Sequence, residues 1–320
     1  MRRSATLRRN LAAVAGAAIL SMGVPSPARA AAGHLDASFR SGGTVTTDFA
    51  GHVDIGYPMA LQPDGKILVA GESGLEGNPK FALARYNADG SLDPTFGGDG
   101  KVTTDLTSYP DDGLAMAIQS NGKIVMAGGA GFGAPNEKFG LVRYNPNGTL
   151  DATFGGDGKV VTDFTQEPDV VFALAIQSNG KLVAGGGSAL GPENNPKFAL
   201  ARYNPNGTLD ATFGGDGKRT TDFTPGDDDV YSLAIQSNGK IVAAGQSGSR
   251  NATFALARYT RNGILDSTFG GGDGKRTTDF TKAYDSIYSV VIQPDGKIVA
   301  AGAAGLGGPN GNFAVARYLA

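Results

Sequence analysis

The 320-residue chain contains 50 glycines, no cysteine and no tryptophan, and its formal net charge is −2 at pH 7. The absence of cysteine excludes disulfides and thiol chemistry. The glycine content is too high for a helical protein, and it has no Gly-X-Y period that would indicate collagen. It is typical of short strands joined by tight turns.

The first thirty residues are expected to be an export signal rather than part of the fold. Four arginines precede an apolar run at 11–24, and Ala28-Arg29-Ala30 forms a small-x-small cleavage pattern. The run is too short to span a bilayer, so we expect cleavage after Ala30, a single mature domain over 31–320 and a secreted or cell-surface location. An uncleaved anchor is the alternative. Arg8-Arg9 also weakly resembles a twin-arginine signal.

Removal of this segment makes the chain more acidic. It carries five arginines and no acid, so the remaining residues have 23 basic and 30 acidic side chains, a net charge of −7. An acidic exported protein is a poor partner for nucleic acid or anionic lipid. No second long apolar run follows, and we expect no membrane span after cleavage.

Five copies of one unit fill the rest of the chain. The run RYNPNGTLDATFGGDGK begins at Arg143 and recurs without change at Arg202, and looser copies lie 56 to 59 residues apart. Self-similarity at a fixed period determines the architecture. An Arg-Tyr pair ends an apolar run in every unit, at Arg85, Arg143, Arg202, Arg258 and Arg317.

Each unit contains four expected strands, which the fourth unit illustrates. Residues 231–236 and 240–244 are apolar runs on either side of Asn238-Gly239, and Asn-Gly is a strong hairpin signal because both residues tolerate positive φ. Residues 254–259 alternate large and small side chains, and residues 275–280 are rich in β-branched ones. No segment has the spacing of an amphipathic helix. The pattern predicts an all-β protein, a five-bladed β-propeller of four-stranded blades.

The two ends of the repeated region are complementary. The last unit stops after its third strand, at 313–318, and the mature N-terminus supplies a fourth-strand sequence at Thr44–Phe49. We therefore predict that Thr44–Phe49 pairs with the last blade and closes the ring, which would remove the exposed strand edges. An open solenoid is the alternative architecture.

The repeated motifs resemble a known family. Leu-Asp-x-Thr-Phe-Gly-Gly-Asp-Gly-Lys, Asp-Gly-Lys-Ile and Phe-Ala-Leu-Ala-Arg-Tyr-Asn are similar to the delta-60 repeat of bacterial proteins, and the resemblance covers residues 34–320. The first unit departs from it at Arg40-Ser41-Gly42. The resemblance implies a β-propeller-type fold and an exported or surface-associated protein, and no catalytic residues belong to the motif.

The five arginines of the Arg-Tyr pairs are expected to be structural. Each shares a strand face with large apolar side chains, and a buried guanidinium without an acceptor is costly. Two sets of aspartates could accept, one following leucine and one in the fourth strands, and the sequence does not distinguish them. The first set is Asp36, Asp93, Asp151, Asp210 and Asp266, and the second is Asp48, Asp105, Asp163, Asp222 and Asp279. A ligand-binding role for the arginines is the alternative.

One further aspartate recurs in loops that otherwise vary. It lies eight residues before the glutamine that ends each first strand, as Asp54, Asp111, Asp169, Asp228 and Asp285. In a propeller these loops lead into the axial strands, so the five carboxylates could ring one mouth of the channel and bind Ca²⁺ or another cation. Alternatively, each aspartate stabilises its own turn. Both interpretations stay open.

The sequence favours a non-catalytic protein. A catalytic site is single, and the two histidines, His34 and His52, form no recognisable constellation. Five-bladed propellers can host glycosidases that use two carboxylates. A secreted carbohydrate-active hydrolase is therefore an alternative, with the unrepeated loop acids as candidates: Glu72, Glu76, Glu137, Glu167 and Glu193.

The variable loops between second and third strands are the expected recognition surface, because loops on a rigid scaffold commonly carry function. They span residues 72–80, 129–138, 187–197, 246–253 and 303–312. We expect a binding scaffold for a protein or glycan ligand, with no certain cofactor. A purely structural role in the cell envelope is a further alternative.

Overall fold

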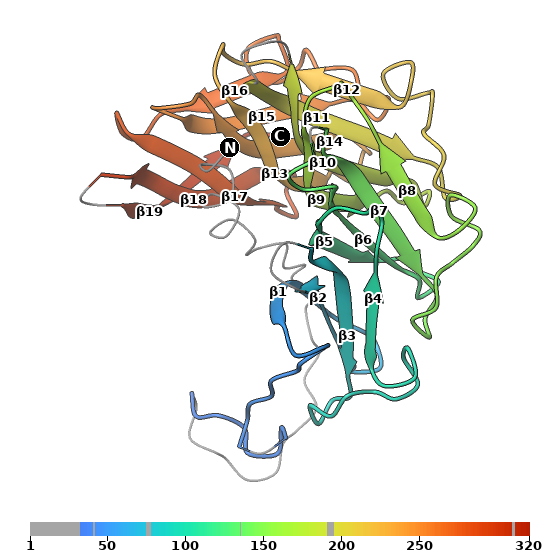
Figure 1. Ribbon diagram of the computed structural model, residues 1–320. Coiled ribbons are helices and arrows are strands. Elements are labelled where there is room, and N and C mark those ends of the chain that lie inside the picture. Colours follow the sequence, from blue (N-terminus) through green and yellow to red (C-terminus); the bar gives the residue numbers. More distant parts are fainter. Residues whose placement is uncertain (1–32, 41, 75–77, 135, 191–194, 309–310) are drawn as a thin grey trace.

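The computed structural model describes residues 33–320 except 41, 75–77, 135, 191–194 and 309–310. The expected export signal lies outside these residues. The described part of the chain contains nineteen strands and no helix (Figure 1), so none of it forms a helix that could cross a membrane. This confirms the predicted all-β class.

The strands form five antiparallel sheets that follow one another along the chain. The first contains β1 (Val53–Leu61), β2 (Ile67–Gly74), β3 (Lys80–Tyr86) and β4 (Lys101–Thr104). The second contains β5 (Asp111–Ile118), β6 (Ile124–Ala130), β7 (Lys138–Tyr144) and β8 (Lys159–Thr162). The third contains β9 (Asp169–Ile176), β10 (Leu182–Leu190), β11 (Asn195–Tyr203) and β12 (Lys218–Thr221). The fourth contains β13 (Asp228–Ile235), β14 (Ile241–Ser247), β15 (Thr253–Tyr259) and β16 (Lys275–Thr278), and the fifth contains β17 (Tyr284–Ile292), β18 (Ile298–Leu306) and β19 (Asn312–Tyr318).

The hairpin turns form where the sequence predicts them. In the fourth sheet Gly239 has a φ of 82° and donates its backbone N–H to Gln236 at 2.8 Å. This turn sets the register that pairs Ile235 with Ile241. A bulge between Val230 and Ser232 then bends β13. The predicted strands of this unit are confirmed to within a few residues.

Large side chains on one sheet pack against small ones on the next. Phe254 and Leu256 of β15 lie in one cluster with Ala300 of the fifth sheet, whereas Ala255 and Ala257 on the other face of the strand lie in a cluster with the third sheet. Because both faces are buried, successive sheets nest as blades. The chain is a five-bladed β-propeller.

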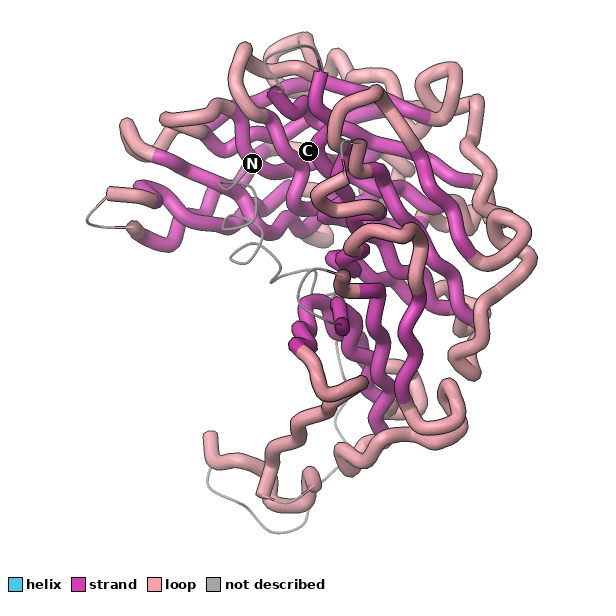
Figure 2. Tube along the Cα trace, in the orientation of Figure 1, coloured by secondary structure: helices cyan, strands magenta, loops and turns pink. Residues whose placement is uncertain are grey.

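The blades form an arc whose ends do not meet. In Figures 1 and 2 the first sheet and the β17–β19 sheet lie on opposite sides of a gap. The last sheet has three strands, with β19 at its edge, and Thr44–Phe49 does not pair with it. The N-terminal segment instead contacts the first sheet, where the Tyr86 hydroxyl donates to Thr47 Oγ1 at 2.7 Å. Ring closure is thus not formed in this structure and stays a prediction.

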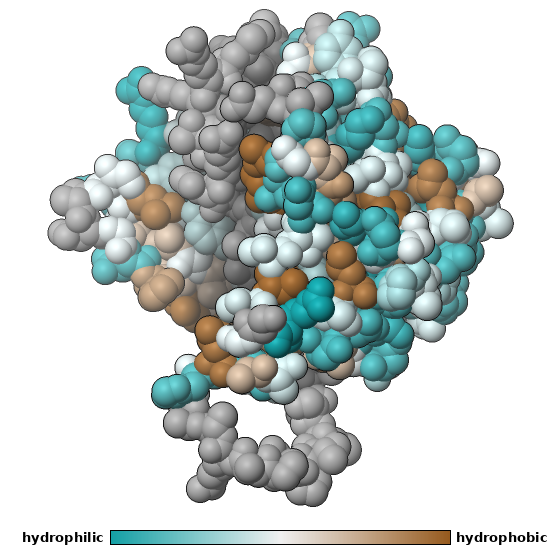
Figure 3. Space-filling model, turned by 60° about the horizontal axis from the view of Figure 1, so that its bottom comes forward, coloured by the Kyte–Doolittle hydropathy of each residue, from teal (hydrophilic) through white to brown (hydrophobic). Residues whose placement is uncertain are grey.

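The surface is mostly hydrophilic. Figure 3 shows hydrophobic residues set in small groups among polar ones on the face turned forward. Large exposed apolar side chains include Phe313 and Val315 at one end of the arc and Met59 and Leu61 at the other. Both ends of the arc therefore expose large apolar side chains.

Candidate functional site

The recurring loop aspartates bind backbone groups of their own loops. Asp111 accepts hydrogen bonds from the backbone N–H groups of Leu106 at 2.7 Å, Thr107 at 3.0 Å and Gly131 at 3.0 Å. The side chain thereby joins the end of one sheet to the first hairpin of the next. Asp285 has the equivalent partners in Phe280, Thr281 and Gly305.

The other three members follow the same pattern with fewer donors. Phe49, Phe164 and Phe223 donate their backbone N–H groups to Asp54, Asp169 and Asp228 at 3.0, 2.7 and 2.8 Å. Asp111, Asp169, Asp228 and Asp285 are fully buried. Across the described ranges, no three His, Cys, Asp or Glu side chains gather to hold a metal ion. The structure does not bring the five carboxylates together into the predicted cation-binding ring. Backbone donors hold each one in its own loop, as the turn interpretation requires.

Burial affects the charge of these aspartates. Desolvation raises the pKa of Asp111 and Asp228 above the ordinary value, against the hydrogen bonds from the backbone. The pKa of Asp169 rises to about 6, chiefly through burial and also through the nearby charge of Asp163. Such shifts are expected for buried acids with few charged partners.

The arginine series forms structural ion pairs in four of the five units. Arg85, Arg143, Arg202 and Arg258 donate Nε–H to Asp93, Asp151, Asp210 and Asp266 at 2.8, 2.6, 2.6 and 2.7 Å. The aspartates that follow leucine are therefore the acceptors, a choice that the sequence left open. Arg317 is exposed and makes no ion pair within the described chain.

Three of these guanidinium groups, those of Arg85, Arg143 and Arg202, also contact the next blade. Arg143 donates to the Pro205 carbonyl oxygen of the third unit and lies 4.6 Å from the Phe154 ring centroid. Burial alone would raise the pKa of Asp151, but hydrogen bonds from Lys123 and Thr153 and the charge of Arg143 lower it well below its usual value. With its donors engaged inside the protein, the arginine acts as a structural residue.

A group of aromatic and polar side chains breaks the symmetry of the repeat. We call it the tyrosine cluster, and its members are Phe172, Asp229, Tyr231, Gln246, Tyr284 and Tyr288. The Tyr231 ring centroid lies 5.3 Å from that of Phe172 and 6.2 Å from that of Tyr288. The cluster thus joins β9, β13 and β17, the first strands of three successive blades.

Hydrogen bonds connect the polar members of the tyrosine cluster. Tyr231 donates its hydroxyl to Asp229 Oδ2 at 3.3 Å, and Gln246 Nε2 donates to the same oxygen at 3.4 Å. The Tyr284 hydroxyl donates to Gln246 Oε1. Burial raises the pKa of Tyr231 and Tyr284, and the charge of Asp229 raises both further. The phenols therefore stay neutral beside a carboxylate at physiological pH.

The sequence analysis missed this cluster, although a signal was present. Three residues after each recurring loop aspartate the chain has Tyr57, Leu114, Phe172, Tyr231 and Tyr288. Four of these five equivalent residues are aromatic. Within a single unit, such a residue looks like an ordinary part of the core. Only the arc places three of the rings side by side.

Two acidic side chains meet in the second blade. Asp112 Oδ1 accepts the backbone N–H of Gly129 at 2.9 Å. This oxygen and Glu137 Oε1 lie 2.5 and 2.2 Å from the position that a Cβ on Gly129 would occupy. Both acids are buried, and glycine is the residue that leaves room for the two carboxylates. Glu137 was one of the predicted catalytic candidates.

The remaining predicted site residues are dispersed. Glu72 accepts a hydrogen bond from the Tyr57 hydroxyl at 3.0 Å, and Glu167 lies half-buried in its loop. Glu76 and Glu193 lie outside the described residues, and both histidines are exposed. Of the predicted recognition loops, only 246–253 is described throughout, and its tip at 249–251 is exposed.

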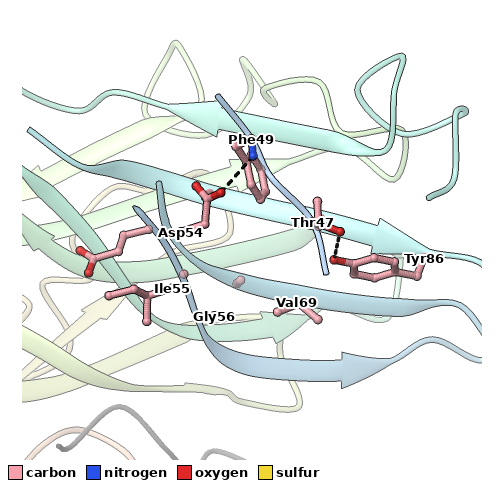
Figure 4. Close-up of a pocket in the computed structure, with 12 residues that line it drawn as sticks. Thr47, Phe49, Asp54, Ile55, Gly56, Val69 and Tyr86 are labelled. Carbon is pink, nitrogen blue, oxygen red and sulfur yellow. Dashed lines mark hydrogen bonds between the residues drawn. The ribbon is translucent and has the colours of Figure 1, made fainter. Parts of the chain in front are cut away.

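A pocket opens on the face of the first sheet at the end of the arc. Figure 4 shows Thr47, Phe49, Asp54, Val69 and Tyr86 around it. The Tyr86–Thr47 and Phe49–Asp54 hydrogen bonds fix one wall, which the N-terminal segment supplies. Small residues such as Ala70, Ala82 and Ala84 line the remainder.

Comparison with known families identifies the repeat. A family described as a domain of unknown function (DUF5122) beta-propeller matches residues 62–96, 119–154, 177–213, 236–269 and 293–320. The chain belongs to this family. These matches fall on all five units of the DUF5122 beta-propeller, while the delta-60 designation stays a prediction. No curated protein matches the sequence.

Several solved structures are similar to this DUF5122 beta-propeller. A protein of unknown function from Dyadobacter fermentans has a TM-score of 0.45 and 10% identity, covering 76% of this chain and 73% of its own. A gluconolactonase from Xanthomonas campestris has a TM-score of 0.41 and 10% identity, covering 82% and 72%. A GH43 endo-arabinanase from Bacillus licheniformis has a TM-score of 0.40 and 11% identity, covering 81% and 91%.

Proposed function

We propose that this chain is an exported, non-catalytic β-propeller that acts as a binding scaffold, with the tyrosine cluster as its ligand site. The observation that carries the proposal is the departure from fivefold repetition. A scaffold of equal units offers one specific site only where the units differ, and three blades contribute different side chains to this cluster.

The chemistry of the cluster favours an organic cation. Aromatic rings attract an ammonium or guanidinium group through their electron-rich faces, and the attraction increases where water is excluded. Asp229 supplies a carboxylate beside the rings, where it accepts hydrogen bonds from Tyr231 and Gln246. The ligand class we propose is therefore a small molecule or partner side chain that carries such a group.

The proposed location outside the cytoplasm depends on the sequence pattern of residues 1–30. Basic residues, a short apolar run and a small-x-small site together are typical of a secretory signal. The acidic remainder of the chain agrees with a cationic ligand, because opposite charge accelerates encounter.

Intrinsic tyrosine fluorescence offers a direct test, since the chain has 10 tyrosines and no tryptophan. Titration with tetramethylammonium or arginine should change the emission and saturate, whereas glucose should not. Asp229→Asn should weaken the binding at least about tenfold, the scale of losing one charged contact. Asp227→Asn, two residues earlier in the chain, is the matched control. Binding that is absent, or unaffected by Asp229→Asn, would refute the proposal.

A carbohydrate-active hydrolase is the second candidate, and the paired acids of the second blade favour it. Glycosidases use two carboxylates on either side of the scissile bond, and Asp112 and Glu137 converge above Gly129. Hydrolysis of chromogenic glycosides by the wild type, lost in Glu137→Gln and retained in Glu167→Gln, would support this activity over a pure binding role.

A further inference from the structure

We call the β17–β19 sheet the tail of the arc, and the first sheet with the segment at 33–49 its head. The tail exposes apolar side chains whose equivalents are buried in every other blade. Phe313 of β19 is 100% exposed and Val315 is 63% exposed. The equivalent phenylalanines of the other four blades, Phe81, Phe139, Phe198 and Phe254, are 0% exposed. The same motif is therefore core in four blades and surface in the fifth.

Two features bury the equivalent phenylalanine elsewhere. The first is a large apolar side chain just after its own fourth strand: Leu106 in the first blade and an aromatic ring in the other three, as where the ring centroids of Phe254 and Phe280 lie 4.9 Å apart. The second is the following blade, since Phe254 belongs to one cluster with Ile287 and Ala300. Within the described residues, β19 has neither feature.

The head of the arc also exposes apolar side chains. Met59 and Leu61 of β1 are 60% and 52% exposed. The residue equivalent to Met59 is Met116, which is 7% exposed and lies in a cluster with Phe81 and Leu83 of the preceding blade. The pocket on the first sheet, lined by Val69, Ala84 and Tyr86, is thus the space that a preceding blade's phenylalanine would fill.

The head also holds the fourth strand that the tail lacks. The Tyr86 hydroxyl binds Thr47 at 2.7 Å, as the Tyr144 hydroxyl binds Thr104 of β4 at 2.7 Å. Lys101 Nζ donates to the Asp48 carbonyl oxygen at 3.0 Å, as Lys159 does to Asp105 at 2.8 Å. The segment at 44–49 therefore lies on the first blade as β4 lies on the second, without a sheet of its own.

The charges at the two ends match as well. In the other four units the arginine of the Arg-Tyr pair binds the aspartate that follows leucine, at 2.6 to 2.8 Å. For Arg317 that aspartate is Asp36, at the head of the chain. Both side chains are exposed, and neither makes an ion pair within the described residues.

We propose that the tail of one copy of this chain docks on the head of a second copy. Phe313 and Val315 enter the pocket of the partner's first sheet, the partner's Thr44–Phe49 adds to β19 as its fourth strand, and Arg317 pairs with the partner's Asp36. An extended segment that adds to a sheet edge is an established mode of recognition. Because the two surfaces differ, the contact is head-to-tail and can repeat.

The interior of the arc explains why the occupant is a second copy. The four interfaces between neighbouring sheets repeat one phenol-to-threonine contact, at 2.7, 2.9, 2.8 and 2.9 Å. With these interfaces intact, the ends of one chain stay apart (Figure 1). Closure within one chain would require a change in at least one of these interfaces, whereas docking of a second copy requires none.

The oligomeric state tests the proposal without reference to any ligand. Light scattering of residues 31–320 should show a mass that grows with concentration. Phe313→Asp should weaken self-association at least about tenfold, as loss of a central aromatic anchor does, without lowering the melting temperature of the monomer. Val161→Asp, at an exposed position of an interior sheet, is the control and should leave association unchanged.

A charge exchange between chains identifies the contact. Arg317→Asp and Asp36→Arg should each weaken self-association, and an equimolar mixture of the two variants should recover it, because alternating chains form the native pair at one contact and the reversed pair at the next. A wild type that stays monomeric at all concentrations, together with a Phe313→Asp variant that melts earlier, would show that the tail docks on its own chain and would overturn the proposal.

Discussion

The interior blades and the two ends of the arc carry the same motif under different conditions. Phe198 is 0% exposed between two sheets, whereas Phe313, in the same place of the repeat, is 100% exposed. Arg202 is buried against Asp210, whereas Arg317 lies in solvent without an ion pair among the described residues. The motif therefore stabilises the fold only where a neighbouring blade buries its side chains.

Truncation of Phe198 in the interior and of Phe313 at the end should give the largest difference in unfolding free energy. Phe198→Ala leaves a cavity between the third and fourth blades and should cost about 3–5 kcal/mol of unfolding free energy. Phe313→Ala removes an exposed ring and should cost the dilute monomer roughly 0.5 kcal/mol or less. Chemical unfolding at low protein concentration measures both, and equal losses would contradict the comparison.

Removal of the arginines should have the next largest effect. Arg143→Ala leaves Asp151 buried with Lys123 as its remaining cation, and breaking a buried pair costs about 3 kcal/mol. Arg317→Ala should be near neutral in the dilute monomer, because its guanidinium has no ion pair to lose in the described structure. Thermal melting of both variants under one buffer provides the measurement.

Acid should destabilise the interior through the paired aspartates. Burial opposes ionisation of Asp210, but hydrogen bonds from Lys181 and Thr212 and the charge of Arg202 lower its pKa to about 2. A lowered pKa in the folded state stabilises above the unfolded value near 4, and this contribution, on the order of 2 kcal/mol, disappears as the pH falls toward 2. Unfolding free energies of the wild type and Asp210→Asn should differ at pH 7 and converge near pH 2.

The end of the chain provides the control for this titration. Asp36 is exposed, and Ser38 is the partner that lowers its pKa. Because Ser38 lies two residues away and the contact is exposed, it depends little on folding, and Asp36→Asn should change the acid dependence of the monomer far less than Asp210→Asn does. A pH profile altered equally by both substitutions would indicate that the ion pairs of the interior are not its source.

Loss of single hydroxyl groups should have the smallest effect. Tyr203→Phe removes the hydrogen bond to Thr162 between buried side chains and should cost about 1 kcal/mol. Tyr86→Phe removes the contact with Thr47, whose segment has no sheet behind it, and should cost less. Hydrogen exchange at 44–49 should nevertheless increase in Tyr86→Phe, and no increase would contradict the placement of that segment.

The sequence predicts the blades well because their signals are local. Asn238-Gly239 determines a turn through two residues, and alternation in 254–259 determines which side chains share a face. The acceptor of Arg202 was harder to predict, because the aspartates at 210 and 222 are both near in sequence and only folding brings one to 2.6 Å.

The candidate site residues depend on information that one unit does not contain. The ring of loop aspartates was predicted from recurrence, but recurrence equally marks a turn, and backbone donors such as Leu106 hold Asp111 inside its loop. The tyrosine cluster needs three blades at their actual separation. Contacts between units therefore cannot be predicted from the sequence of one repeat alone.

The most direct test of the account uses the absence of native cysteine. Phe313→Cys and Met59→Cys, placed on separate chains, are mixed and oxidised, and the products are resolved by mass. The account predicts a disulfide-linked heterodimer, because the tail of one copy meets the head of another. A mixture that stays uncrosslinked, while a chain with both cysteines forms an internal disulfide, would contradict it.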